Sequence, residues 1–253
     1  MYSFGGNAGH LTVNTADGQE QLFSGNLGST APNLALTKAG SGTLSLTGAN
    51  TYSEGTTVNA GTLALGHTSA LGANTGNLML NGGTLDLGTY SPAVGTVFFN
   101  GGTFTNGTLD NATAFEVGTG SLSANLGGVS ALTKSGPGAF TLSGNNTRSG
   151  GTTVRDGTLS ITDTASLGSG PLSVAHGGTL NYTGNIQTTL STAATFDGAG
   201  SAFYNGTCDR IVLRFDLRDG DKTLSVLNGA SVTEATPGGP AEFQTMPISP
   251  EPL

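Results

Sequence analysis

The sequence predicts an all-β fold, namely a right-handed single-stranded parallel β-helix (β-solenoid) with about nine or ten coils of roughly 20 residues up to residue 205. Three observations predict it: a long internal repeat, a composition rich in glycine and poor in charge, and short apolar segments at regular spacing. Each is typical of a chain that winds repeatedly around one core.

The internal repeat is the strongest of these observations. Residues 36–72 return as residues 132–168 with a constant offset of 96 residues and no gap, and 20 of the 37 aligned positions are identical. A repeated unit has to stack on copies of itself, because one unit alone cannot bury its apolar face. The repeat therefore indicates a stacked architecture.

The composition agrees with short strands joined by tight turns. Of the 253 residues, 43 are glycine and 9% are charged, against about 25% charged in average soluble proteins. Glycine does not recur at every third position, which excludes a collagen pattern. No window carries apolar residues at helical spacing without interruption by glycine or β-branched residues, so we expect no long helix.

Short strands are predicted in order along the chain. They are expected at residues 43–46, 56–58, 62–65, 78–80, 84–87, 97–99 and 103–105. Val58 and Leu63 must both face the core although their separation is odd, so strict alternation fails between them. We therefore predict a corner at residues 59–61, with an asparagine or glycine at positive φ.

The last 46 residues differ from the rest in charge. Residues 1–207 contain 13 charged residues, whereas residues 208–253 contain 11. We predict that residues 1–207 form the β-helix and that residues 208–253 form a divergent tail. Alternation in the tail predicts a β-hairpin at residues 209–227 that covers the open end of the coils, followed by a disordered proline-rich end.

Both copies share a long pattern that begins Leu-Thr-Lys and ends Leu-Gly. The residues to which we assign a structural role are Lys38, Gly42, Leu46, Tyr52, Gly55, Val58, Gly61 and Leu63 in the first copy, and Lys134, Gly138, Leu142, Gly151, Val154, Gly157 and Leu159 in the second. This pattern resembles the autotransporter-associated β-strand repeat, also called the passenger-associated transport repeat, of bacterial type V secretion. The second copy departs from it at Pro137, Phe140 and Arg148, which replaces the tyrosine.

The resemblance implies a passenger fragment that is displayed on the bacterial cell surface, at the outer membrane, or secreted. It implies an outer-membrane β-barrel translocator as partner, and this barrel is absent from this chain. It also implies that the repeats assist translocation by folding outside the cell. The usual role in the family is adhesion, to a host surface or a polysaccharide. We see no secretory signal at the start and no run of 18 apolar residues that spans a membrane.

The alternative is a carbohydrate-active β-helix enzyme, similar to a polysaccharide lyase or glycosidase. Such enzymes need two or three carboxylates close together. The nearest sets are Asp156 and Asp163 with Arg155, and a tail group with Arg214. The acids of that tail group are Asp209, Asp216, Asp219 and Asp221. Because Asp156 occupies a corner and the tail acids alternate with arginine, we expect turn and surface roles rather than an enzyme.

Other ligand classes find little support in the sequence. His10, His67 and His176 lie in unrelated contexts without ligand spacing, and Cys208 has no partner for a disulfide. The net charge of −8 and the absence of a basic stripe disfavour nucleic acid. We expect neither a metal nor another cofactor.

Overall fold

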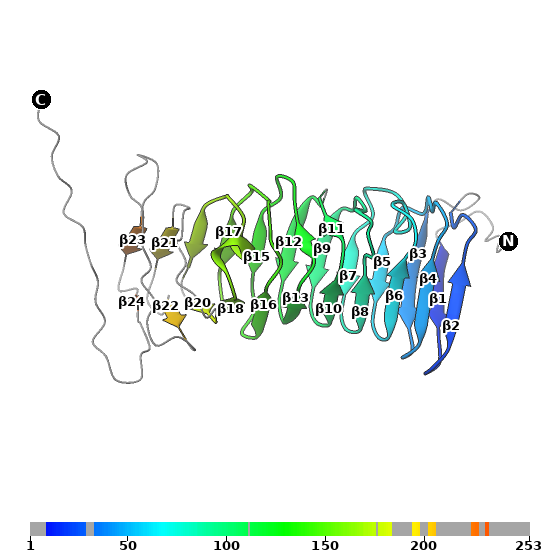
Figure 1. The fold of residues 1–253 in the computed structure, drawn as a ribbon, viewed down its shortest axis with the longest axis horizontal. Helices are drawn as coiled ribbons and strands as arrows, with labels where there is room; N and C mark the ends of the chain where they lie inside the picture. The colour runs from blue at the N-terminus through cyan, green and yellow to red at the C-terminus, as the bar shows by residue number, and fades with distance from the viewer. Residues whose placement is uncertain are drawn as a thin grey trace, which may run out of the picture.

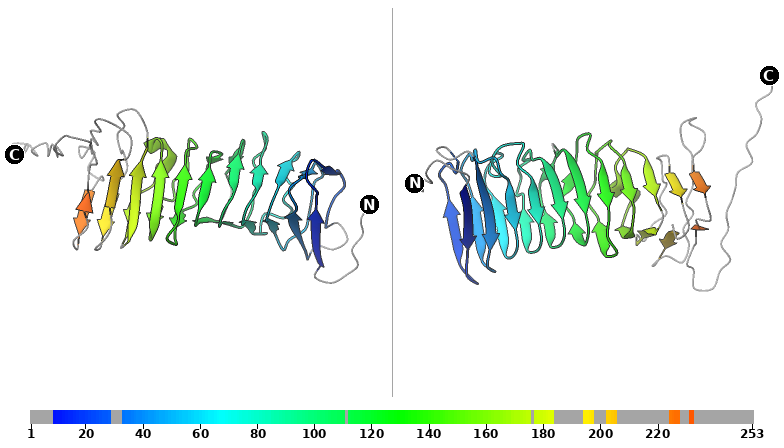
Figure 2. Two further views of the ribbon diagram at one scale, coloured as in Figure 1. Left: turned by 90° about the horizontal axis from the view of Figure 1, so that it is seen from below. Right: turned by 180° about the vertical axis from the view of Figure 1, so that it is seen from behind.

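The computed structural model shows an elongated stack of coils that extends from the N-terminal to the C-terminal side (Figure 1). It describes residues 9–28, 33–110, 112–175, 177–183, 194–197, 202–205, 224–227 and 231–232. Each coil contributes one strand to each of two long sheets, whose neighbouring strands are all parallel and succeed one another along the stack (Figure 2).

The two long sheets contain 11 strands each. The first sheet consists of β1 (Gly9–Asn14), β3 (Leu34–Ala39), β5 (Thr56–Val58), β7 (Leu78–Leu80), β9 (Thr96–Phe99), β12 (Ala114–Val117), β15 (Leu132–Lys134), β17 (Thr152–Val154), β19 (Leu172–Val174), β21 (Ala194–Asp197) and β23 (Leu224–Leu227). The second sheet consists of β2 (Glu20–Phe23), β4 (Thr43–Leu46), β6 (Thr62–Leu65), β8 (Thr84–Asp86), β10 (Thr103–Thr105), β13 (Gly120–Leu122), β16 (Ala139–Leu142), β18 (Gly157–Ile161), β20 (Gly178–Tyr182), β22 (Ala202–Asn205) and β24 (Ser231–Val232).

Two further elements lie between these strands. A small parallel sheet joins β11 (Thr108–Leu109) to β14 (Asn125–Leu126), and a short 3-10 helix, η1, spans Thr164–Leu167. In the part of the chain that the structure describes, no helix is long and apolar enough to cross a membrane.

The predicted parallel β-helix is confirmed. The ten strand pairs from β1 and β2 to β21 and β22 agree with the nine or ten coils expected up to residue 205. In the tail, β23 and β24 add an eleventh pair, parallel to β21 and β22. The first strand of the predicted hairpin at 209–227 and the proline-rich end lie outside the described residues, and the domain boundary at residue 207 stays a prediction.

A glycine corner permits both flanking strands to face the core. Val58 and Leu63 are fully buried, and Gly61 between them has a φ of +66°. A Cβ atom added to Gly61 would lie 2.3 Å from the carbonyl oxygen of Gly42 in the preceding coil. Gly157 repeats this geometry with a φ of +65°. Only glycine accepts both the backbone conformation and the close approach, so the predicted corner is confirmed.

The core consists of side-chain columns that run along the stack. In the first sheet, one inward column takes one side chain from each successive coil. Its members are Val13, Lys38, Val58, Leu80, Phe99, Val117, Lys134, Val154 and Val174. An aliphatic member contributes about 1.5–3 kcal/mol when fully buried. Because two members are lysines, the column has to hold charge as well as apolar surface.

Candidate functional site

The motif lysines occupy positions of the interior column that are otherwise apolar, and their ammonium groups bind the corners. Lys38 is fully buried, and its Nζ donates to the carbonyl oxygens of Ala39 at 2.7 Å, Gly40 at 2.6 Å and Ala60 at 3.2 Å. Lys134 is also fully buried and makes the equivalent three bonds in the second copy. Its partners are the carbonyl oxygens of Ser135 at 3.0 Å, Gly136 at 2.7 Å and Asp156 at 3.1 Å. Each ammonium group thereby joins its own corner to the next one.

Each motif lysine is followed by a corner of the same length. The corners that follow Lys38 and Lys134 contain four residues, at 39–42 and 135–138, whereas the corner after Val58 contains three. Carbonyl oxygens of these corners lie within reach of the ammonium group, which supplies three donors for them. Loss of hydration lowers the pKa of both lysines, and the Asp156 carboxylate partly opposes this effect for Lys134.

A buried asparagine connects three successive coils in each copy. Asn50 accepts a hydrogen bond from the backbone N–H of Leu27 at 2.9 Å and donates to the carbonyl oxygen of Ala70 at 2.6 Å. Asn146 repeats this arrangement between Leu126 and Ser166. Asn50 and Asn146 occupy the same position of the two copies, but their bridging role was not predicted, because the amide partners come from coils about 20 residues away in sequence.

Replacing either asparagine by alanine is expected to lower the free energy of unfolding by about 1–3 kcal/mol, because a buried N–H and a buried carbonyl both lose their partner. Urea unfolding of Asn50→Ala and Asn146→Ala measures the loss. Asn145→Ala is the matched control, since Asn145 is exposed and adjacent in sequence to Asn146. A control as destabilised as the two buried variants would contradict the bridging role.

The tyrosine of the motif is the position at which the two copies differ most. Tyr52 is fully buried, and its hydroxyl lies 2.6 Å from Oγ1 of Thr56. Burial raises the pKa of Tyr52, so the phenol is neutral. In the second copy Arg148 is fully buried at this position and donates to the oxygens of Gly151, Thr152 and Leu167. The arginine thus keeps a bond to the same threonine of the repeat.

Arg148 is a buried cation without a carboxylate partner among the described residues. Desolvation lowers the pKa of Arg148 to about 10, which leaves the side chain charged at neutral pH. Its Nε and the Oγ of Ser166 are both buried without a hydrogen-bond partner within the described structure. This coil therefore holds a polar group that the fold satisfies only in part.

The remaining motif residues line the same coils. The leucines are buried in the second sheet, and an added Cβ atom at each of the glycines would lie within 2.8 Å of an adjacent coil. The leucines are Leu46, Leu63, Leu142 and Leu159, and the glycines are Gly42, Gly55, Gly138 and Gly151.

The carboxylates weighed for an enzyme serve their own turns. Asp156 accepts a bond from the backbone N–H of Gly157 at 2.8 Å, as expected for a corner residue. Asp163 caps η1 by accepting from the backbone N–H of Ala165 at 2.8 Å. The tail set lies outside the described residues. These are Asp209, Arg214, Asp216, Asp219 and Asp221.

The histidines likewise have local partners. Nε2 of His10 lies 2.9 Å from Oγ1 of Thr37, and Nδ1 of His67 accepts from the backbone N–H of Ser69 at 2.9 Å. His176 and Cys208 lie outside the described residues. Over the described ranges, no three His, Cys, Asp or Glu residues are grouped so as to hold a metal ion.

The outer face of the first sheet carries a column that changes character halfway along the stack. Most of its members are short hydroxyl side chains, but three successive coils place Met79, Phe98 and Glu116 there instead. The column runs Thr12, Thr37, Thr57, Met79, Phe98, Glu116, Thr133, Thr153 and Ser173. This change of character was not predicted from the sequence.

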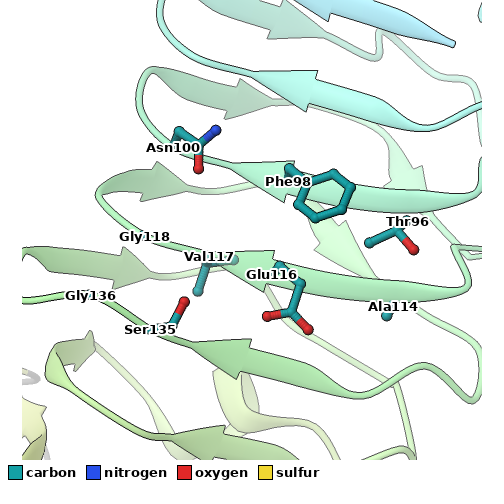
Figure 3. Close-up of a pocket in the computed structure, with 9 residues that line it drawn as sticks. All are labelled: Thr96, Phe98, Asn100, Ala114, Glu116, Val117, Gly118, Ser135 and Gly136. Atoms are coloured by element: carbon teal, nitrogen blue, oxygen red, sulfur yellow. The ribbon is translucent and has the colours of Figure 1, made fainter.

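Phe98 and Glu116 line a shallow depression of about 630 Å³, which we name the Phe98 depression (Figure 3). Small residues create the hollow, because Ala114 and Gly118 leave space beside the large phenyl ring. Its lining consists of Thr96, Phe98, Asn100, Ala114, Glu116, Val117, Gly118, Ser135 and Gly136. Figure 3 shows the Phe98 ring broadside, with the Glu116 carboxylate on the neighbouring strand.

Glu116 is the charged residue of the Phe98 depression. Within the described residues its carboxylate has neither a hydrogen-bond nor an ionic partner. The exposed large hydrophobic side chains of the described residues are Leu22, Met79 and Val129, of which Met79 belongs to this column, next to Phe98. An unpaired carboxylate, a ring and short polar side chains thus meet on an otherwise hydroxyl-covered sheet.

Comparison with known proteins finds the same repeat. Residues 36–65 and 132–161 match the family model described as the passenger-associated-transport-repeat. The chain is 37% identical over 131 residues to the Adhesin BmaC autotransporter of Brucella suis biovar 1 (strain 1330), a match that covers 50% of this chain and 4% of that protein. No solved structure matches the chain. Together with the parallel β-helix, these findings confirm the predicted resemblance: two segments of the chain carry the passenger-associated-transport-repeat, and half of the chain is similar to part of an autotransporter adhesin.

Proposed function

We propose that this passenger is displayed on, or secreted from, the bacterial cell surface as a β-helical stalk that mediates adhesion. We further propose that its coils assist outer-membrane translocation by folding outside the cell. The observation that carries both proposals is the sheet order, in which each strand pairs only with the coil before and the coil after. Such a stack folds by adding one coil at a time.

Translocation requires a partner and an unfolded chain. The partner is an outer-membrane β-barrel translocator on the C-terminal side, as in other autotransporters. One cysteine in 253 residues excludes an intrachain disulfide that would hold part of the chain folded inside the pore. The C-terminal coils emerge first, and each coil that folds outside prevents the chain from sliding back.

Adhesion is supported by the shape and by the relative. The stack presents two long outer sheet faces (Figure 2), and a rigid surface loses little conformational freedom when it binds. The similar Brucella suis protein is named an adhesin, although the present chain spans 4% of its length. We infer that the chain binds a host surface or polysaccharide and is not an enzyme, since Asp156 and Asp163 both serve local turns.

Two matched glycines test the translocation role. We place the chain between a secretory signal peptide and a C-terminal translocator barrel in a Gram-negative host and measure the fraction accessible to protease on intact cells. Gly61→Ala and Gly157→Ala each force an alanine to positive φ, at a cost of at least about 1–2 kcal/mol. Because Gly157 lies nearer the barrel, Gly157→Ala is expected to lower the accessible fraction more than Gly61→Ala.

Three comparisons complete this test. Asn145→Ala, on the exposed surface, should leave the fraction unchanged. Equal fractions for the two glycine variants, at equal measured destabilisation, would contradict assistance by folding. Cells that display the wild-type chain should attach to epithelial monolayers better than cells with the barrel alone; no difference would contradict adhesion.

A further inference from the structure

The outward column of the first sheet concentrates its unusual side chains in one place. Threonines precede the trio Met79, Phe98 and Glu116, and hydroxyl side chains follow it. A hydroxyl column is the regular surface of this stack, so the trio requires a local reason. An exposed methionine and a half-buried phenyl ring lie side by side there, next to an unpaired carboxylate, and we take this local departure as the mark of a binding surface.

We propose that the Phe98 depression binds a neutral glycan, with one sugar ring stacked on the face of Phe98 and its hydroxyl groups donating to the Glu116 carboxylate. This inference rests on the adhesive function proposed above and names its site and its class of ligand.

The chemistry of a sugar fits each component of the depression. A pyranose ring presents axial C–H groups on one face, and the face of a phenyl ring carries the negative part of its quadrupole. Figure 3 shows that ring broadside, without another labelled side chain across it. Sugar hydroxyls around the stacked face would find hydrogen-bond partners in Glu116, Thr96 and Asn100, which line the same hollow. A small number of polar groups placed around an aromatic surface is sufficient to orient a bound ligand.

The charges favour a neutral sugar over an acidic one. Glu116 is negative, no lysine or arginine lines the depression, and the whole chain carries a net charge of −8. A sialic acid, uronate or sulfate would be repelled at this position, since nothing there compensates its charge. A neutral hydroxyl group instead donates to the carboxylate, in a charge-assisted hydrogen bond.

The extent of the apolar surface favours a glycan over a protein. Protein interfaces have an apolar centre built from several large side chains. Here the large apolar side chains at the surface are Phe98 and the neighbouring Met79, since Val117 is buried and the other lining positions are small or polar. The site therefore matches one sugar ring and its substituents.

Binding is tested with the whole chain, biotinylated and multimerised on streptavidin so that a weak site is detected through avidity. The probes are a printed panel of neutral oligosaccharides, including N-acetyllactosamine and cellotetraose, next to their sialylated or sulfated counterparts. We expect binding to one or more neutral probes and none to the acidic counterparts. Phe98→Ala should lower the affinity about tenfold, and Phe98→Tyr should retain it because the ring remains. Glu116→Gln should weaken binding several-fold.

Thr133→Ala is the matched control, since it lies in the same column outside the depression and should bind as the wild type does. Circular dichroism confirms that each variant folds. The proposal is wrong if no neutral probe binds, if only acidic probes bind, if Phe98→Ala binds equally well, or if attachment survives removal of all glycans from the target surface. If cells that display the wild type and cells that display Phe98→Ala attach equally well, the adhesive function is supported but the Phe98 depression is not its site. If neither attaches, the proposed adhesive function is wrong.

Discussion

Lys134→Met and Lys38→Met are each expected to lower the free energy of unfolding by about 2–4 kcal/mol. Each ammonium group donates to three carbonyl oxygens of two successive corners. Methionine fills a similar volume but donates nothing, so these part-buried oxygens lose the ammonium donor, although the carbonyl oxygen of Ala39 keeps its bond from the backbone N–H of Thr15. Burying the ammonium group costs desolvation free energy, which the methionine variant avoids. The loss of the three hydrogen bonds outweighs this gain, because all three N–H groups are used in the fold.

The control for packing is Leu80→Met, in the same interior column. A volume-conserving apolar exchange of this kind costs less than about 1.5 kcal/mol. Because a long repeat array need not unfold in one step, amide hydrogen exchange of β3 and β15 measures the local free energy. A lysine variant as stable as Leu80→Met would show that the corners do not depend on the ammonium group.

The overall fold follows from the sequence because its cause is periodic. The constant 96-residue offset and the glycine corners fix which side chains face inward, and the strands expected at residues 43–46, 56–58 and 62–65 are found with those bounds. Leu44 and Leu46 alternate with Thr43 and Ser45, so their burial follows from strand geometry alone. Local spacing is sufficient to predict burial wherever one segment of the sequence contains both the strand and its corner.

The buried charges were not predicted, because rules of composition place lysine and arginine outside. The sequence nevertheless contained a signal. Lys38 stands two residues after Leu36, on the same side of its strand, and its corner is one residue longer than the corner after Val58. For Arg148 the signal is its alignment with Tyr52. A neutral aromatic residue at that position in the first copy indicates that the position faces the core.

The Phe98 depression was beyond sequence analysis for a different reason. Its residues become neighbours through registers that advance by unequal steps: Thr57 pairs with Met79, Met79 with Phe98, and Phe98 with Glu116. These steps are 22, 19 and 18 residues, obtained from the differences between the paired numbers. This region lies between the two clear copies of the repeat, so no template aligns one coil with the next. Only the structure shows which outward side chains are adjacent.

Arg148→Tyr is expected to raise the free energy of unfolding by about 1–4 kcal/mol, which is the range for replacing a buried charge by a well-packed side chain. The substitution restores the residue found at the same place in the first copy, where the hydroxyl of Tyr52 already pairs with Thr56. It also removes the buried Nε that has no partner within the described residues. Thr152 stands where Thr56 stands in the first copy and supplies the new tyrosine with the same partner.

The reverse change provides the matched comparison. Tyr52→Arg introduces a buried cation without a carboxylate and is expected to lower the free energy of unfolding by about 3–5 kcal/mol. Amide hydrogen exchange of β5 and β17 measures the two effects separately. Five strand steps separate these coils, about 24 Å at the usual strand spacing, so the effects should add in the double variant.

The sign of the change at Arg148 decides between two accounts of that coil. If Arg148→Tyr stabilises the fold, the arginine is a tolerated departure from the motif, and its bonds to Gly151, Thr152 and Leu167 only offset its desolvation. If Arg148→Tyr destabilises the fold, those bonds exceed the cost of burying the charge. The motif position would then select for a donor that reaches the inner carbonyl oxygens, rather than for an aromatic ring.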